Sequence, residues 1–154
     1  MKNESVPTEN NYENLIFSAW LLQNRKISNL INRLPDEDLN RDIIPGRNSG
    51  VYLLGHLIAS NDLLMPLFGF GDKMFPEYEK IFLCTPDKCV EKLPAANQLK
   101  AHWFVLNEQL RMRFMDSRKN EADENPLLSN QKLSTLLYVI NHQCYHLGQL
   151  SFLL

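Results

Sequence analysis

Two histidines stand four residues apart near the end of the sequence, in the segment NHQCYHLGQL that runs from Asn141 to Leu150. On an α-helix such residues point in directions that differ by only about 40°, with Cβ atoms roughly 6 Å apart. His142 and His146 can therefore bind one metal ion, at about 2.0–2.1 Å from each imidazole nitrogen. The H-E-x-x-H motif uses the same spacing, but its glutamate is missing here, so no general base comes with the pair.

A third ligand must come from elsewhere in the chain, and His56 is the best candidate. It lies in the apolar stretch LLGHLIAS, where a buried imidazole needs a polar partner. The preceding residue, Gly55, would let another backbone approach closely. His102 lies close to Lys100 and off the apolar line of its helix, so we expect it to be a partly exposed surface residue and not a ligand.

Three further side chains are candidates to orient the imidazoles, because a ligand histidine usually donates its second N–H to an oxygen. Gln149 and Tyr138 share a helix face with His142, and Ser60 lies one turn beyond the third histidine. Tyr138 and Tyr145 have simple core packing as an alternative. The histidines themselves have a structural alternative, in which each imidazole is hydrogen-bonded in a polar core or at an interface.

The spacing of apolar residues predicts four helices that carry these side chains. The first covers residues 12–34; the second starts near residue 49 with Asn48 or Ser49 as its cap and ends at Pro66 and Gly69. The third follows Pro94, and the fourth runs from about residue 129 to the end. The stripe of the first helix consists of Tyr12, Leu15, Ile16, Ala19, Leu22, Ile27, Leu30, Ile31 and Leu34. The stripe of the third consists of Leu99, Trp103, Leu106, Leu110 and Phe114.

Four helices without an alternating strand pattern predict an all-α fold, a four-helix bundle in a single domain over residues 1–154. Residues 69–94 contain glycine, proline and several aromatics, and we expect a long crossover between the second and third helices with one short helix in it. The first ten residues are polar and are expected to be flexible, and DSRKNEADENP is expected to be a solvated loop. Bundles build metal sites from side chains that project inward from facing helices.

The last helix is apolar nearly all round, since no Lys, Arg, Asp or Glu follows Lys132. It is long enough to cross a bilayer of about 30 Å. Its histidines, glutamines and asparagine favour instead a buried helix of a soluble bundle. A helix of this kind is deeply buried or has two packing partners. We expect its face away from the histidines to cover the other helices or a second subunit, and we expect a homodimer. That face consists of Leu136, Ile140, Cys144, Leu147 and Ser151.

Charge and cysteine content narrow the class of protein. The net charge of −2 offers no basic face for nucleic acid. The N-terminal segment MKNESVPTENNYENLIF lacks the features of a signal peptide, which predicts a cytoplasmic protein with three reduced cysteines. Cys84 and Cys89 could share a metal ion, but no second pair lies nearby to complete such a site.

The segments GVYLLGHLIASNDLL and LSTLLYVINHQCYHLGQLSFLL, with the polar turn LPDEDLN, resemble the DinB-like (DinB/YfiT-like) family, whose members are regarded as metalloenzymes. The H-x-x-x-H-x-G-Q run is the most specific part of the match. The resemblance implies a four-helix bundle, often dimeric, with a divalent metal ion bound by His56, His142 and His146. Members with assigned activities include thiol-dependent S-transferases and isomerases that use thiols such as bacillithiol or mycothiol. This sequence carries Gln143 and Leu147 where relatives often have Glu and Arg.

Three kinds of function remain open from the sequence. A three-histidine site with an open position predicts a metal-dependent enzyme, with zinc or nickel as the ion. Such an enzyme would activate a water or a thiol, for hydrolysis or for S-transfer with a low-molecular-weight thiol. The alternatives are a non-catalytic metal-binding or stress-response protein, and a helical interaction module whose histidines only pack.

Overall fold

The computed structural model describes residues 9–119 and 130–154, and there the chain is helical without any strand. Four helices are long: α1 (Glu9–Arg33), α3 (Gly50–Asp62), α6 (Ala96–Lys119) and α7 (Asn130–Leu150). The shorter elements are α2 (Asp36–Leu39), α4 (Leu64–Leu67), α5 (Glu77–Phe82) and the 3₁₀ turns η1 (Asp87–Cys89) and η2 (Ser151–Leu153). The predicted all-α class is confirmed.

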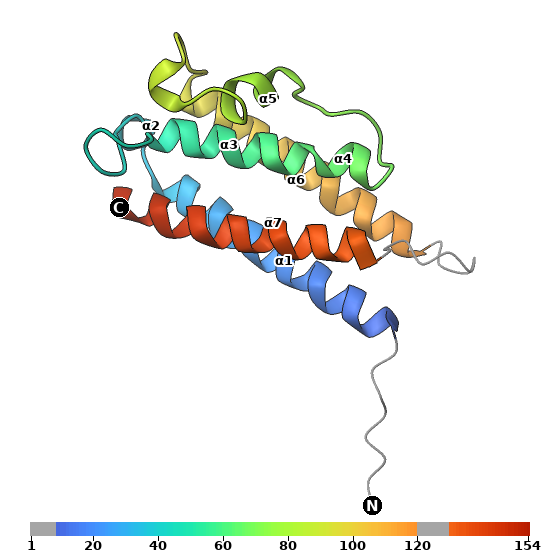
Figure 1. Ribbon diagram of the computed structural model, residues 1–154. Coiled ribbons are helices and arrows are strands. Elements are labelled where there is room, and N and C mark those ends of the chain that lie inside the picture. The colour runs from blue at the N-terminus through green and yellow to red at the C-terminus, as the bar shows by residue number, and fades with distance from the viewer. Residues whose placement is uncertain (1–8, 120–129) are drawn as a thin grey trace, which may run out of the picture.

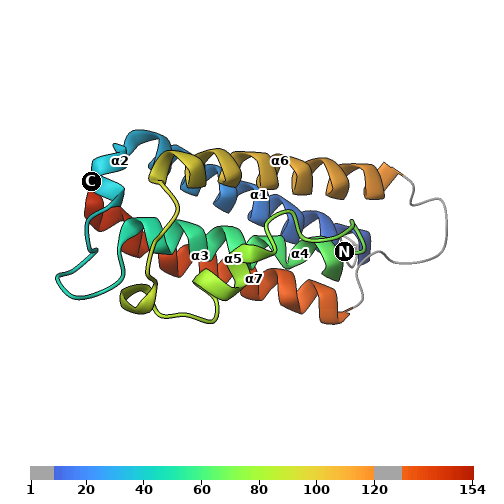
Figure 2. The ribbon, with the colours of Figure 1, turned by 90° about the horizontal axis from the view of Figure 1, so that it is seen from above.

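The four long helices lie side by side, and each contacts two of the others (Figure 1 and Figure 2). α1 packs against α7 and α6, and α3 packs against the same two helices from the other side. The core between them contains fully buried apolar side chains from every long helix, among them Trp20, Leu57, Trp103 and Leu136. Burying apolar side chains of this size contributes about 1.5–3 kcal/mol each, so this shared core holds the four helices together.

Two predictions about flexible segments fall largely outside the described residues. Of the first ten residues, 1–8 are not described, and residues 9 and 10 already belong to α1. Most of the predicted solvated loop lies in the undescribed segment 120–129, although its first residues still belong to α6.

The crossover between α3 and α6 is long, as predicted, but it contains two short α-helices and a 3₁₀ turn instead of one short helix. Two buried carboxylates attach the crossover to the two ends of α3. Asp62 accepts hydrogen bonds from the backbone N–H groups of Met74 and Phe75, at 2.8 and 2.7 Å. Asp87 accepts one from the backbone N–H of Ser49, at 2.6 Å. α5 is thereby held along one side of α3 (Figure 2).

α3 begins at the predicted cap and ends slightly earlier than predicted. The Ser49 hydroxyl accepts a hydrogen bond from the backbone N–H of Tyr52, so Ser49 is the N-cap of the two candidates. The helix ends at Asp62, and the chain turns at Leu63 into α4. Gly69 then adopts a positive φ of 72°, which favours glycine and stops the helical path.

The predicted stripe of α1 is wrong over its first half. The core residues there are Phe17 and Trp20, and the buried line continues through two polar residues, Gln23 and Asn24. The exposed members of the predicted stripe are Tyr12, Leu15, Ala19 and Leu22. Because Gln23 and Asn24 are polar but buried, they interrupt the apolar spacing of α1, and the spacing therefore predicted the wrong buried face for the first half of this helix. The second half of this stripe and the whole stripe of α6 are buried as predicted.

α7 is also less buried than its composition suggested. Leu136 and Val139 lie in the core, but Leu137 and Tyr138 are exposed. The predicted back face is mixed, because Leu136 is buried, Ile140 and Leu147 are half-buried, and Cys144 and Ser151 are exposed. No helix among the described residues combines the length and the apolar character that a membrane span requires. The homodimer stays a prediction.

Four buried amide side chains, one from each long helix, meet inside the core: Asn24, Asn61, Asn107 and Gln143. The Gln143 Nε2 donates to Oδ1 of Asn24 at 2.8 Å and to Oδ1 of Asn61 at 2.9 Å. The Asn61 Nδ2 donates to Oδ1 of Asn107 at 2.7 Å. Because a buried amide without partners is costly, this network favours one alignment of α7 against α1 and α3.

Gly55 on α3 makes room for α5. A Cβ at this position would lie 2.2 Å from two ring carbons of Phe82, which is fully buried. The sequence predicted that another backbone would approach Gly55 closely. The close neighbour is instead an aromatic ring. This contact brings the Phe82 main chain next to residue 56.

The substitution Gly55→Ala should destabilise the protein by up to about 2 kcal/mol. Overpacking costs about 1–3 kcal/mol, and the better helix propensity of alanine offsets about 1 kcal/mol of that cost. Urea unfolding measures the difference. The matched control is Gly148→Ala in α7, where no atom lies within 4 Å of the added Cβ and a gain of about 0.5–1 kcal/mol is expected. Equal stabilities of the two variants would contradict this packing.

Candidate metal centre

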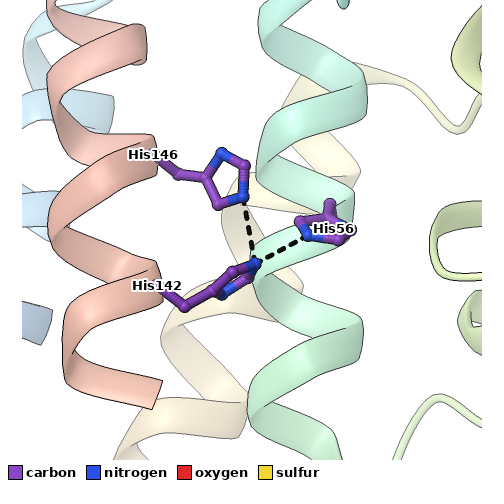
Figure 3. Close-up of side chains that lie close together, drawn as sticks. All are labelled: His56, His142 and His146. Atoms are coloured by element: carbon purple, nitrogen blue, oxygen red, sulfur yellow. Dashed lines mark hydrogen bonds between the residues drawn. The ribbon is translucent and has the colours of Figure 1, made fainter. Parts of the chain in front are cut away.

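Three histidines from two helices point toward one another (Figure 3). His56 projects from α3, and His142 and His146 project from α7, one helical turn apart. The Nε2 atom of His142 lies 2.8 Å from Nε2 of His56 and 3.0 Å from Nε2 of His146. Among the described residues, this is the group of three or more potential ligands whose donor atoms all lie within 4.8 Å of one another. The structure thus brings together the three residues that the sequence singled out.

The main-chain carbonyl of Phe82 orients the ring of His56. Its oxygen lies 2.8 Å from Nδ1 of His56, and a carbonyl oxygen can only accept a hydrogen bond. Nδ1 therefore carries a proton, and Nε2 is the ring nitrogen that faces His142. The segment that supplies this carbonyl is held by Tyr52, whose hydroxyl donates to the carbonyl of Thr85 at 2.8 Å. This partner could not be predicted from the sequence, because a main-chain carbonyl has no residue signature.

The side chain of Gln149 orients the ring of His146 by accepting a hydrogen bond from it. The Nδ1–H of His146 donates to Oε1 of Gln149 at 2.7 Å, and the Gln149 Nε2 donates to the Tyr145 hydroxyl at 3.1 Å. The amide orientation and the histidine tautomer therefore agree, and the Nε2 lone pair of His146 also faces His142. Gln149 was predicted for this role, and the structure places it there.

The other two predicted supports are wrong. The Ser60 hydroxyl donates to the main-chain carbonyl of His56 at 2.8 Å and not to an imidazole. Tyr138 stacks on the His142 ring, with centroids 6.3 Å apart and planes at 13°. Tyr138 and Tyr145 are 70% and 64% exposed, so core packing is wrong for both. Both tyrosines instead shield the outer side of the histidine pair.

Burial keeps the pair on α7 neutral. Desolvation, followed by the neighbouring imidazoles of His146 and His56, lowers the pKa of His142 to about 4. Desolvation also lowers the pKa of His146, although its hydrogen bond to Gln149 acts in the opposite direction. At neutral pH these rings are therefore unprotonated, which is the form that binds a metal ion.

The donor set fits one divalent cation. Two Nε2 lone pairs converge on a third Nε2, and their Nδ1–H groups are already bonded to oxygens, as in histidine ligands generally. Neutral imidazoles suit zinc, nickel, copper and iron. The residues present therefore match the three-histidine metal site that the sequence predicted.

Other metal-binding residue types lie outside this group. The ring of His102 stacks on Phe75 with centroids 4.2 Å apart, and its Nδ1 lies 2.8 Å from the Tyr78 hydroxyl. Burial raises the pKa of Tyr78 to about 12, so the hydroxyl keeps its proton. His102 is half-buried, which agrees with the partial exposure predicted from the sequence, and its ring belongs to an aromatic cluster. The three cysteines are exposed and unpaired.

In metal-free protein, we expect the histidine cluster to lower stability in mild acid. The unfolded chain, with an ordinary histidine pKa near 6.5, takes up a proton at His142 at a higher pH than the folded chain does. The contribution of His142 to the free energy of unfolding is therefore fully present above about pH 6.5 and is lost as the pH falls toward about 4. Urea unfolding of chelator-treated protein between pH 7.5 and 4.5 measures this slope. In His142→Gln the slope should be shallower, and an unchanged slope would contradict the burial of a neutral ring.

The comparison with known families agrees with the resemblance noted in the sequence. The model of the DinB family matches residues 6–154, which include both histidine-bearing helices. No curated protein matches the chain. Because the family match covers nearly the whole sequence, the chain belongs to the DinB family.

Proposed function

We propose that this protein is a metal-dependent enzyme in which His56, His142 and His146 hold one divalent ion, zinc or nickel. The observation that carries the proposal is the convergence of three Nε2 atoms from two helices. Membership of the DinB family supports it, since the family fits a metal-dependent helical protein.

Three protein ligands suit a catalytic role better than a structural one. Structural zinc sites are closed by four protein ligands, whereas catalytic sites use three and keep one position for water or substrate. The group found among the described residues has three members. When bound, the ion supplies a Lewis acid that makes a water or a thiol more acidic. Burial keeps the imidazoles of His142 and His146 neutral, and Phe82 and Gln149 orient the rings of His56 and His146.

The chemistry of the group favours a thiol as the nucleophile. The three-residue group contains no carboxylate, and Gln143, next to His142, is fully buried among the core amides. A thiol, with an ordinary pKa of about 8.5, is close enough to ionisation to need no strong base. In S-transfer the sulfur forms a bond to an electrophilic carbon, the leaving group departs with the bonding electron pair, and the thiol proton passes to solvent. Hydrolysis of an ester is the second reaction to test.

The metal content of untagged protein tests the ligand set. We expect about one divalent ion per chain, because the geometry offers one three-nitrogen site. The variant His142→Ala/His146→Ala should lose the ion, whereas His102→Ala, which changes a histidine outside the cluster, should keep it. Elemental analysis after extensive dialysis measures the content. Unchanged metal in the double variant would rule out this site.

Turnover by metal-loaded protein tests the reaction. Bacillithiol or mycothiol with an aromatic halide as electrophile should give a thioether product, followed by absorbance, at a rate above the uncatalysed one. The rate should fall to background in His56→Ala, because the third ligand is lost. Ester substrates run in parallel distinguish hydrolysis from S-transfer. A bound ion without turnover in any of these assays would favour the non-catalytic metal-binding alternative.

A further inference from the structure

A hollow of about 480 Å³ lies where the loop before α3 approaches the C-terminal end of α7. Its volume falls within the range of small-molecule pockets, about 300–1,000 Å³. Apolar side chains form much of its wall: Ile43 and Ile44 from the loop, Leu53 from α3 and Phe152 from η2. This composition suits the apolar part of a small molecule.

The hollow adjoins the histidine cluster. Gln149, which accepts the Nδ1–H of His146, also lines it. Tyr145 lines it as well, and its ring meets the His146 ring edge-on with centroids 5.0 Å apart. Leu53 lies one helical turn before His56 on α3. A molecule in this hollow therefore touches the residues that surround the candidate metal ligands.

One cation, Arg47, lines the hollow. Two nearby cations are already paired, Arg41 with Asp38 and Lys88 with Asp42. Arg47 has no ion-pair partner in the part of the chain that the structure describes. Its guanidinium is exposed and can still bind an anion.

The loop that carries Arg47 is ordered by its own hydrogen bonds. The backbone N–H of Ile43 donates to the carbonyl of Asn48, and that of Arg47 donates to the carbonyl of Ile44, both at 2.9 Å. The backbone N–H of Gly46 donates to the Asp42 carboxylate at 3.0 Å, and Gly46 has a positive φ of 78°. The loop thus presents Arg47 from a fixed turn, which lowers the entropic cost of binding a ligand.

We propose that this hollow binds the non-reacting part of the substrate, and that this part carries a carboxylate and an apolar segment. The carboxylate pairs with Arg47, which matches carboxylate geometry through two N–H groups. The apolar segment lies on Ile43, Ile44 and Phe152, and the reactive end extends past Gln149 to the histidines. This assignment rests on the proposed function, because it identifies a substrate class for the same site.

The test uses two probes of the same shape, 4-phenylbutyrate and its neutral amide, 4-phenylbutyramide. Each is titrated into zinc-loaded protein, and binding is followed by ¹H–¹⁵N NMR. The shifts should cluster at Ile43, Ile44, Leu53 and Phe152, and the carboxylate should bind about three- to ten-fold more tightly than the amide, as expected for one charge-assisted contact at a partly exposed site. Equal affinities of the carboxylate and the amide would overturn the assignment, and so would chemical-shift changes confined to residues outside the hollow.

Matched variants identify the group responsible. Arg47→Gln should remove the preference for the carboxylate and leave amide binding unchanged. Arg25→Gln is the control, because Arg25 is also exposed and lines a different hollow, between α1 and α6. An equal loss in both arginine variants would indicate a general charge effect and overturn the proposal. Phe152→Ala, at an exposed position, should weaken both probes, and unchanged binding there would equally count against it.

A titration of chelator-treated protein separates this proposal from the metal site. A carboxylate can also bind a metal ion directly, so a preference that vanishes without zinc and survives in Arg47→Gln would place the carboxylate on the ion and overturn the role of Arg47. A preference that persists without zinc and depends on Arg47 supports the hollow even if the proposed reaction fails.

Discussion

The hydrogen bond between His56 and the carbonyl of Phe82 is the interaction on which the histidine cluster depends. It determines which imidazole nitrogen carries the proton and therefore which one can bind a metal. The carbonyl reaches His56 because the Phe82 ring lies against Gly55, where any side chain would collide with it. Buried Asp62 and Asp87 hold the crossover that carries Phe82. A long connection between helices is thus part of the site.

The histidine cluster also depends on the alignment of α7 with α3, since His142 and His146 come from α7 and His56 comes from α3. A purely apolar interface allows helices to shift with little loss of burial, whereas hydrogen-bonded amides favour one register. Gln143, the neighbour of His142, is bonded to both Asn24 and Asn61 in the core. We interpret this network as the element that fixes His142 and His146 opposite His56. Its hydrogen bonds offset only part of the cost of desolvation, because Nδ2 of Asn24 and Oε1 of Gln143 are buried without a hydrogen-bond partner in the described part of the chain.

Local periodicity explains what could be predicted from the sequence. The four-residue interval of His142 and His146, the stripe of α6 and the Ser49 cap are properties of short segments, and each appears in the structure. His56 stood out because it is a polar residue among leucines. The failures come from tertiary contacts: buried amides shifted the face of α1, and Ser60 bonds to its own helix. The Phe82 carbonyl could not be found, because the crossover shows no periodic pattern and its main chain is the partner.

X-ray absorption spectroscopy of zinc- or nickel-loaded protein tests the central claim most directly, because it reports the ligand atoms around the ion. The account predicts three imidazole nitrogens at about 2.0–2.1 Å, with the outer-shell scattering of the rings. The remaining coordination would come from oxygen, supplied by water or buffer. Sulfur at about 2.3 Å, the distance for a cysteine ligand, or fewer than three imidazoles would contradict it.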